Sequence, residues 1–209
     1  MTSMPMFPLG SVLFPHMPLP LRVFEKRYLV MLSRILGSEP AEFGVVLIER
    51  GQEVGGGEQR FRYGTVARIV QVNATEEFVM LVAQGERRFE VTEWLEEDPH
   101  PQAIVRDLPH LEWTDALLPL KQQAERAVRR VLSLASEFTE QRWPPDVELS
   151  TDPTAAAWQL AAIAPLGPLD QVALLRSTTM AELLNSVLEY TAAAEDSFSA
   201  PWPPPASLS

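Results

Sequence analysis

The side chains that most often carry catalysis are scarce in this sequence of 209 residues. There is no cysteine, so thiolate nucleophiles, disulfides and thiolate-bound metals are excluded. Only two lysines occur, and Lys26 is followed by Arg27 and Lys121 by Gln122, so neither completes a phosphate loop, in which serine or threonine follows the lysine. The same two lysines would have to serve any serine–lysine dyad. These residues give no support to ATP hydrolysis or peptide cleavage.

The three histidines and the one run of glycines give no sign of a metal or phosphate site. His16, His100 and His110 do not have the spacing of metal ligands. The glycines at 55–57 are not followed by a helical pattern, which favours a hairpin tip over a phosphate cradle. We therefore predict that the protein is not an enzyme and uses neither a metal nor a cofactor.

One cluster of carboxylates, at Glu93, Glu96, Glu97 and Asp98, could in principle support acid–base chemistry. Two carboxyl groups can divide the roles of acid and base when their environments differ. Prolines at positions 99 and 101 adjoin the cluster and indicate a turn. We favour a solvated loop over a reaction site.

The charge balance restricts the classes of partner. Lysine and arginine together number 17 against 28 aspartates and glutamates, a net charge of −11. Such a field repels nucleic-acid phosphates and anionic membranes. The sequence contains neither a signal-peptide pattern nor an apolar run of membrane-spanning length. We predict a cytoplasmic protein without membrane contact, and we do not expect nucleic acid among its partners.

Strand-forming patterns extend from Phe7 to about Leu108. Prolines interrupt their start, and since proline cannot donate to a ladder, short edge-like strands are predicted there. Glu25 to Leu36 carries a helical apolar face that ends before Gly37. The later strand-like runs predict a small closed or half-closed barrel; they are 43–48, 61–72, 78–83, 87–94 and 103–108.

After Trp113 the apolar period changes to that of helices. A long amphipathic helix is predicted over about 117–138. Three further helix starts carry capping patterns, at Asp152 with Pro153, at Gly167 with Pro168, and at Thr179 with Glu182. We predict a β lobe at 1–113, a helical lobe at 114–195, and a disordered tail rich in proline and serine at 196–209.

The segment FPLGSVLFPHMPLPLRVFEKRYLVML at 7–32 resembles the first motif of the Lon protease N-terminal (substrate-binding) domain family. Three further pieces match in the same order: GTVARIVQV at 64–72, GERRFEV at 85–91, and AWQLAAIAPLGPLDQVALLRSTTMAELLNSVLEY near the C-terminus. The resemblance spans about residues 4 to 190. His16 stands where many stand-alone members have glycine, and Arg22 where they often have histidine.

This resemblance implies an α+β fold, in which a PUA-like β pseudo-barrel with one inserted helix is followed by a C-terminal helical bundle. It further implies a stand-alone, non-catalytic protein-binding module without the ATPase and peptidase of the full protease. The expected partners are unfolded or tagged segments of client polypeptides, together with a protease or other degradation machinery if the module is an adaptor.

Unfolded protein is recognised through adaptable apolar surface, and the N-terminal motif is rich in methionine and aromatic residues. The prolines of 15–20 prevent a complete ladder, so we predict a groove there with open backbone groups, suited to strand addition. The alternative is that most of these side chains fill the core. The predicted substrate-binding residues are Pro15, Met17, Leu19, Phe24, Glu25, Lys26 and Tyr28.

RNA binding is an alternative from a different class. Arg60, Arg62 and Arg68 alternate along one strand with Phe61, Tyr63, Thr65, Ala67 and Ile69, and Arg87 and Arg88 follow in a later strand. Interleaved arginine and aromatic residues bind single-stranded RNA in other proteins, and PUA-like barrels include RNA binders. The acidic balance of the β lobe counts against this alternative.

Overall fold

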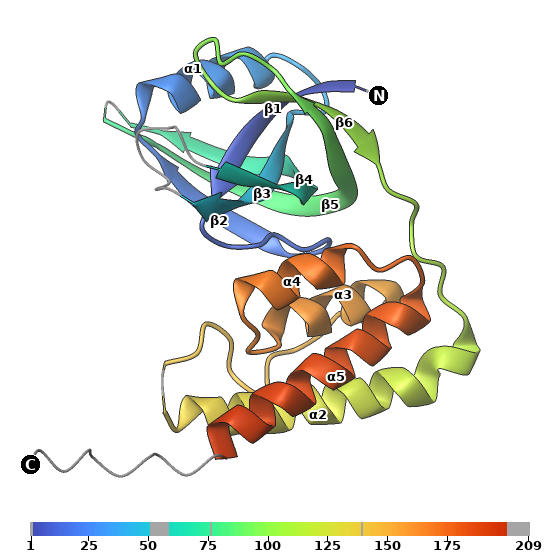
Figure 1. Cartoon of the computed structure of the whole chain (residues 1–209). Coiled ribbons are helices and arrows are strands. Elements are labelled where there is room, and N and C mark those ends of the chain that lie inside the picture. Colours follow the sequence, from blue (N-terminus) through green and yellow to red (C-terminus); the bar gives the residue numbers. More distant parts are fainter. Residues whose placement is uncertain (1, 51–58, 76, 139, 200–209) are drawn as a thin grey trace, which may run out of the picture.

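A computed structural model describes residues 2–50, 59–75, 77–138 and 140–199, which form one lobe of strands and one of helices (Figure 1). The predicted glycine tip at 55–57 and residues 200–209 of the predicted tail lie outside this description. The described strands end at Asp107, and helical structure begins again at Asp115, close to the predicted change of period.

Six strands form one mixed sheet that closes into a ring. The strand order is β2-β5-β4-β3-β1-β6, and β5 also pairs with β6, so five strands close the ring and β2 is added outside β5. The β1–β3 pair is parallel and the other pairs are antiparallel. The strands are β1 Thr2–Leu9, β2 Pro18–Val23, β3 Glu42–Arg50, β4 Gln59–Ala74, β5 Val79–Trp94 and β6 Gln102–Asp107.

The inserted helix α1, Lys26–Ile35, lies between β2 and β3, and Glu25 and Leu36 are its cap residues, as the sequence pattern predicts. The helical lobe follows the strands, so the predicted α+β fold of a ring-like sheet, an inserted helix and C-terminal helices is confirmed. Its elements are η1 Asp115–Leu117, α2 Leu118–Ser136, α3 Pro153–Ile163, α4 Pro168–Leu175 and α5 Met180–Ser199.

The strand β5 corrects the prediction of separate strands at 78–83 and 87–94, because the ladder continues through Gly85. The Gly85 N–H donates to the Met17 carbonyl at 2.9 Å, and the Gly85 carbonyl accepts from the His16 N–H at 2.8 Å. A Cβ at this position would lie 2.1 Å from the Phe14 carbonyl oxygen. Glycine therefore lets the chain segment before β2 approach β5 closely without interrupting it.

Local sequence signals set the helix starts of the C-terminal lobe. The Asp152 carboxylate accepts a hydrogen bond of 2.7 Å from the Ala155 N–H, which is the predicted N-cap. The Thr179 hydroxyl accepts from the Glu182 N–H at 3.1 Å, while the Glu182 carboxylate accepts from the N–H of Thr178 at 2.7 Å. The capping box is thus present with its return bond moved by one residue.

The tail prediction is wrong for residues 196–199, because α5 continues to Ser199. Its last turns lie against α2, where Glu195 forms an ion pair of 2.6 Å with Arg130 and Phe198 stacks on Phe138 with ring centroids 6.0 Å apart. These contacts stabilise a segment whose own composition indicates disorder. The neighbour that provides them is far away in the sequence.

The two lobes share one hydrophobic core, which extends from the inner face of β2 and β5 through α1 to α3, α4 and α5. Phe14, before β2, meets Trp158 of α3 with ring centroids 6.3 Å apart. A smaller core inside the ring contains Met6, Val66 and Phe89. Since the larger core crosses the lobe boundary, neither lobe completes its packing alone.

His16 lies in a turn just before β2 with a φ of 63°, in the left-handed region. This is the position at which many members of the family that the sequence resembles have glycine. We expect His16→Gly to raise the free energy of unfolding by about 0.5–1 kcal/mol, because relief of backbone strain exceeds the extra entropy that glycine loses on folding.

Urea unfolding followed by tryptophan fluorescence measures this change. His16→Ala keeps the strain and serves as the control, so it should not stabilise the protein. Equal stability of the two variants would contradict the assignment of strain to this turn.

Candidate polypeptide-binding surface

The seven residues predicted to bind substrate separate into buried and accessible groups. Pro15, Met17, Leu19 and Tyr28 are buried, and the Tyr28 ring stacks on Phe7 with centroids 4.0 Å apart. Met17, Leu19 and Tyr28 belong to the larger hydrophobic core, which is the alternative considered above. The accessible members are the side chains of Phe24, which is 56% exposed, Lys26, which is exposed, and Glu25, which is half-buried.

The incomplete ladder predicted at 15–20 is corrected for positions 18–20, which pair with β5 on one side, while the other side of β2 is a free edge. The Met17 carbonyl accepts from the Gly85 N–H, so the backbone groups of Leu19 and Leu21 also point toward β5. Pro18 and Pro20 then face outward, where a missing N–H removes no bond within the sheet. The same prolines leave the free edge of β2 poor in donors and therefore poorly suited to strand addition.

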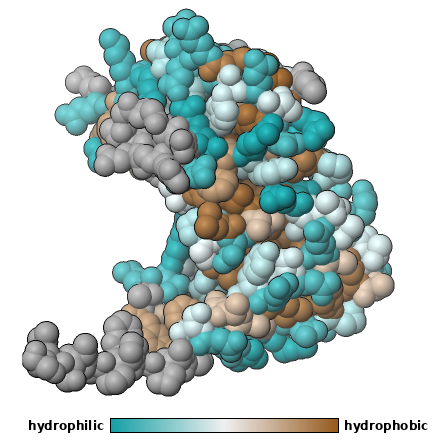
Figure 2. Space-filling view, viewed as in Figure 1, coloured by the Kyte–Doolittle hydropathy of each residue, from teal (hydrophilic) through white to brown (hydrophobic). Residues whose placement is uncertain are grey.

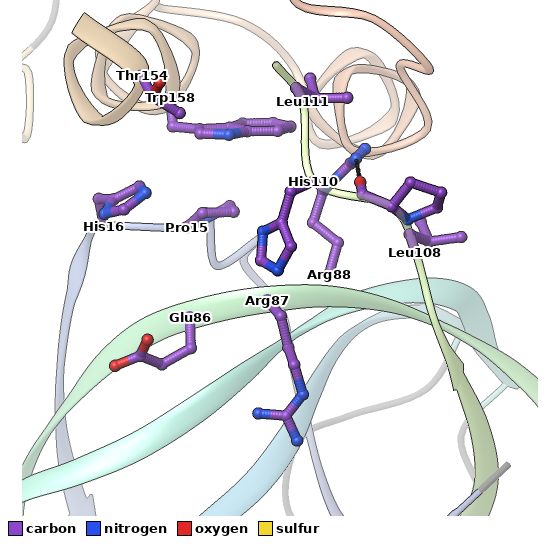
Figure 3. A pocket seen from close by; sticks show the side chains of 11 residues that line it. Pro15, His16, Glu86, Arg87, Arg88, Leu108, His110, Leu111, Thr154 and Trp158 are labelled. Carbon is purple, nitrogen blue, oxygen red and sulfur yellow. Dashed lines mark hydrogen bonds between the residues drawn. The ribbon is translucent and has the colours of Figure 1, made fainter. Parts of the chain in front are cut away.

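Pro15 lies at a cavity of about 220 Å³ between the lobes, together with His16, His110 and Trp158 (Figure 3). Figure 2 shows that the outline of the molecule is hollowed between the lobes and that apolar side chains gather at the floor of this hollow. The junction between the lobes therefore combines apolar side chains with charged ones, among them Glu86, Arg87 and Arg88.

Arg88 of β5 crosses that junction with only 5% of its surface exposed. It donates hydrogen bonds of 2.6–2.7 Å to the carbonyls of Leu175, Ser177 and Pro109, and its guanidinium lies 4.9 Å from the Trp158 ring centre. Burial lowers the pKa of Arg88 to about 10, against the opposing effect of the Glu182 charge, so the guanidinium stays protonated at neutral pH. Its N–H donors are used within the fold, so the prediction that Arg88 contributes to an RNA-binding surface is wrong.

The other arginines of the RNA alternative also have partners within the chain. Their partners are Glu97 at 2.5 Å for Arg60, the Val91 carbonyl at 3.0 Å for Arg62, Glu86 at 2.7 Å for Arg68, and Glu42 at 2.9 Å and Asp107 at 3.0 Å for Arg87. A bulge after Thr65 also breaks the alternation of β4, so that Thr65, Val66 and Ala67 are all buried. Both observations disfavour an RNA-binding surface.

Exposed apolar side chains gather at one end of the β lobe. Among the described residues eight large apolar side chains are exposed, and five of them lie just after β2, just after α1 and on the β4–β5 ribbon. We call these five the distal apolar surface. They are Phe24, Leu36, Val70, Val72 and Met80.

The sheet register places three of these residues at the same end of the sheet. Val23, which precedes Phe24, is aligned with Val79 of β5 and Ala74 of β4, while Met80 and Val72 lie one and two residues from that row. Neighbouring strands are about 4.8 Å apart, so the ends of β2 and β4 are separated by roughly 10 Å. The sequence analysis missed Val70 and Val72, because a bulge between Ile69 and Gln71 breaks the alternation of β4. Val72 is paired with Leu81 and therefore lies on the face of Ile69, while Met80, paired with Asn73, lies on the opposite face.

Within the described parts of the chain, no three acidic or histidine side chains are arranged to hold a metal ion. The helices that the structure describes include none with the length and apolar character needed to cross a membrane. Glu97 of the carboxylate cluster is ion-paired with Arg60 and lies 3.6 Å from Arg27.

The chain is thus an α+β module in which a ring-like sheet packs on a helical lobe, with the distal apolar surface at the far end of the sheet. Residues 3–193 match the family model of the substrate-binding domain of the ATP-dependent protease La (LON). The chain belongs to this family, as the sequence resemblance predicts.

Two relatives are full-length proteases. The Lon protease of Magnetococcus marinus is 31% identical over 151 residues, which cover 67% of this chain and 18% of that protein. The Lon protease of Anaeromyxobacter dehalogenans is 30% identical over 146 residues, which cover 66% of this chain and 17% of that protein. The chain therefore spans less than a fifth of the length of these relatives.

Two solved structures have a similar fold. A Lon N-terminal domain protein from Xanthomonas campestris is 26% identical with a TM-score of 0.63, covering 91% of this chain and 99% of that one. The N-terminal domain of a Mycobacterium avium complex Lon protease has a TM-score of 0.62 over 91% of this chain and 98% of that one. At 18% identity the second likeness concerns the fold alone.

Proposed function

We propose that this chain is a non-catalytic module that binds unfolded or tagged segments of client polypeptides, either alone or as an adaptor to a protease or other degradation machinery. The match of residues 3–193 to a substrate-binding domain carries this proposal. Exposed apolar side chains at one end of the β lobe support it, since such surfaces bind nonpolar segments of other chains.

Within the predicted binding residues, the structure favours a division of roles. Phe24 contacts the client, because its ring is the accessible apolar group of the set, and Glu25 and Lys26 form a polar rim beside it. The buried members hold β2 and α1 in place. Tyr28 anchors α1 through its stacking on Phe7, and Leu19 packs on the inner face of the sheet.

We expect Phe24→Asp to weaken binding of a permanently unfolded reporter by about fivefold or more, because a charge replaces an apolar contact of roughly 1 kcal/mol or more. Fluorescence anisotropy with labelled, reduced and carboxyamidomethylated lysozyme measures the affinity. The loss should persist at about 0.5 M salt, where exposed charge interactions are largely screened.

Leu118→Asp is the matched control, since Leu118 is 47% exposed but lies on α2 of the other lobe. It should change the affinity less than about twofold. Equal losses in both variants would show that any added negative charge weakens binding and would remove Phe24 from the site. Reporter affinity that falls steeply with salt and is lost on Arg62→Ser would instead favour an electrostatic site.

A further inference from the structure

The sheet has a second free edge, on β4, at the same end as the distal apolar surface. Pairing of β3 with β4 extends to Glu42 opposite Arg68, and the Ile69 N–H donates to the Ala41 carbonyl at 2.9 Å. Beyond this point β4 continues to Ala74 with only β5 beside it among the described strands. In Figure 1 the β4–β5 ribbon extends to the left, away from the ring.

The direction of the backbone groups on this edge follows from the hairpin. The Thr75 N–H donates to the Phe78 carbonyl at 2.9 Å, so Thr75 points toward β5. Because backbone direction alternates along an antiparallel strand, the N–H and C=O groups of Val72 and Ala74 point away from β5. No backbone partner for these groups is present in the described parts of the chain.

This edge has none of the features that protect β2. Pro18 and Pro20 remove two donors from the β2 edge, whereas the outward positions Val72 and Ala74 of β4 retain their N–H groups. Residues 70–74 are all exposed, and the valines at 70 and 72 have 56% and 38% of their surface accessible. Alternating open donors and acceptors are complementary to an extended backbone, which fixes the conformation of the partner.

The surroundings of the edge define the chemistry of that partner. An open hollow of about 550 Å³, lined by Leu36, Glu39, Pro40 and Ile69 among others, adjoins the start of the edge. Glu39 lies at this end and Glu77 at the hairpin end, and both are exposed and form no ion pair with any described residue. The valines favour apolar side chains, and the two carboxylates favour basic residues at either end of the bound segment.

We infer that the β4 edge from Val70 to Ala74 binds a client segment as an added β-strand, with an apolar centre of about five residues flanked by lysine or arginine. This inference rests on the proposed function and specifies its binding mode. It also moves the strand addition that the sequence predicts at 15–20 from the proline edge of β2 to the open edge of β4.

The test uses the full chain and a fluorescein-labelled peptide, Lys-Val-Thr-Val-Thr-Val-Lys, with a twin that is N-methylated at alternate backbone nitrogens. Val72→Pro removes the outward N–H without removing a bond to β5, and Val72→Thr keeps that N–H in a side chain of similar shape. We expect about tenfold weaker peptide binding for Val72→Pro, and for the N-methylated peptide with wild-type protein, but less than about threefold for Val72→Thr.

Pro20→Val is the control for the other edge, since it restores a donor on β2, and it should leave peptide affinity unchanged. Equal affinity of the methylated and unmethylated peptides for wild-type protein would overturn the inference, whether or not Val72→Pro folds. Tighter binding by Pro20→Val with no effect of Val72→Pro would overturn it in favour of β2. A concentration-dependent dimer in sedimentation that Val72→Pro abolishes would assign the edge to a second copy and overturn the client assignment.

The unfolded lysozyme reporter separates this inference from the proposed function. If wild-type protein binds the reporter and Val72→Pro binds it equally well, the added strand is wrong while the binding function stands. If wild-type protein binds neither reporter nor peptide, the proposed function itself is wrong.

Discussion

Replacing Arg88 with methionine is expected to lower the free energy of unfolding by about 3 kcal/mol or more. The substitution keeps much of the apolar volume against Trp158 but removes the donors to the carbonyls of Leu175, Ser177 and Pro109. Each buried carbonyl that loses its donor costs about 1–3 kcal/mol. These carbonyls belong to the end of α4, to the turn after it and to the chain between the lobes, so the loss should loosen the lobe junction first.

Urea unfolding monitored by tryptophan fluorescence measures the stability, and amide hydrogen exchange locates the loosened region. Arg62→Met is the matched control, because Arg62 is exposed and donates to the Val91 carbonyl. It should cost less than about 1 kcal/mol. Equal losses in the two variants would mean that Arg88 acts as an ordinary surface arginine.

Replacing Gly85 with alanine is expected to destabilise the protein by about 2–4 kcal/mol. The new Cβ would lie 2.1 Å from the Phe14 carbonyl oxygen, and this neighbour is backbone, so a rotamer change cannot relieve the contact. The segment before β2 must move away from β5. Its two hydrogen bonds to Gly85, from the His16 N–H and to the Met17 carbonyl, lengthen as it moves.

Gly37→Ala provides the comparison, because a Cβ at Gly37 meets its nearest atom, the Arg34 carbonyl oxygen, at 4.0 Å. Its stability should stay within about 0.5 kcal/mol of wild type, as expected for an open surface position. Thermal unfolding followed by circular dichroism compares both variants with wild type. A Gly85→Ala protein as stable as Gly37→Ala would show that the turn before β2 adjusts freely.

Gly85 also links the stability of the sheet to the proposed binding surface. Gly85 lies on the strand that joins β2 to β4, and both of those strands carry residues of the distal apolar surface. A variant that loosens β5 would therefore weaken polypeptide binding without touching the client. Binding measurements on Phe24 and Val72 variants are informative only where circular dichroism shows a folded sheet.

The sequence by itself determined the features that depend on neighbours a few residues away. The start of α3 at Asp152, the start of α4 after Gly167, and the limits of α1 all follow from capping residues and apolar period. The α+β class and the family resemblance were likewise accessible, since strand and helix periods occupy separate halves of the chain. Capping residues and the apolar period specify these features without any long-range contact.

Only the tertiary structure decided which side chains are accessible and which edge is open. Met17 and Tyr28 have the composition of a binding surface, but both are buried in the larger core, where the Tyr28 ring stacks on Phe7. Arg88 finds one of its carbonyl partners 87 residues away, at Leu175, and no local pattern encodes that contact. The open backbone groups of Val72 exist because β3 leaves β4 at Glu42, and strand pairing at that distance in sequence depends on the closed ring as a whole.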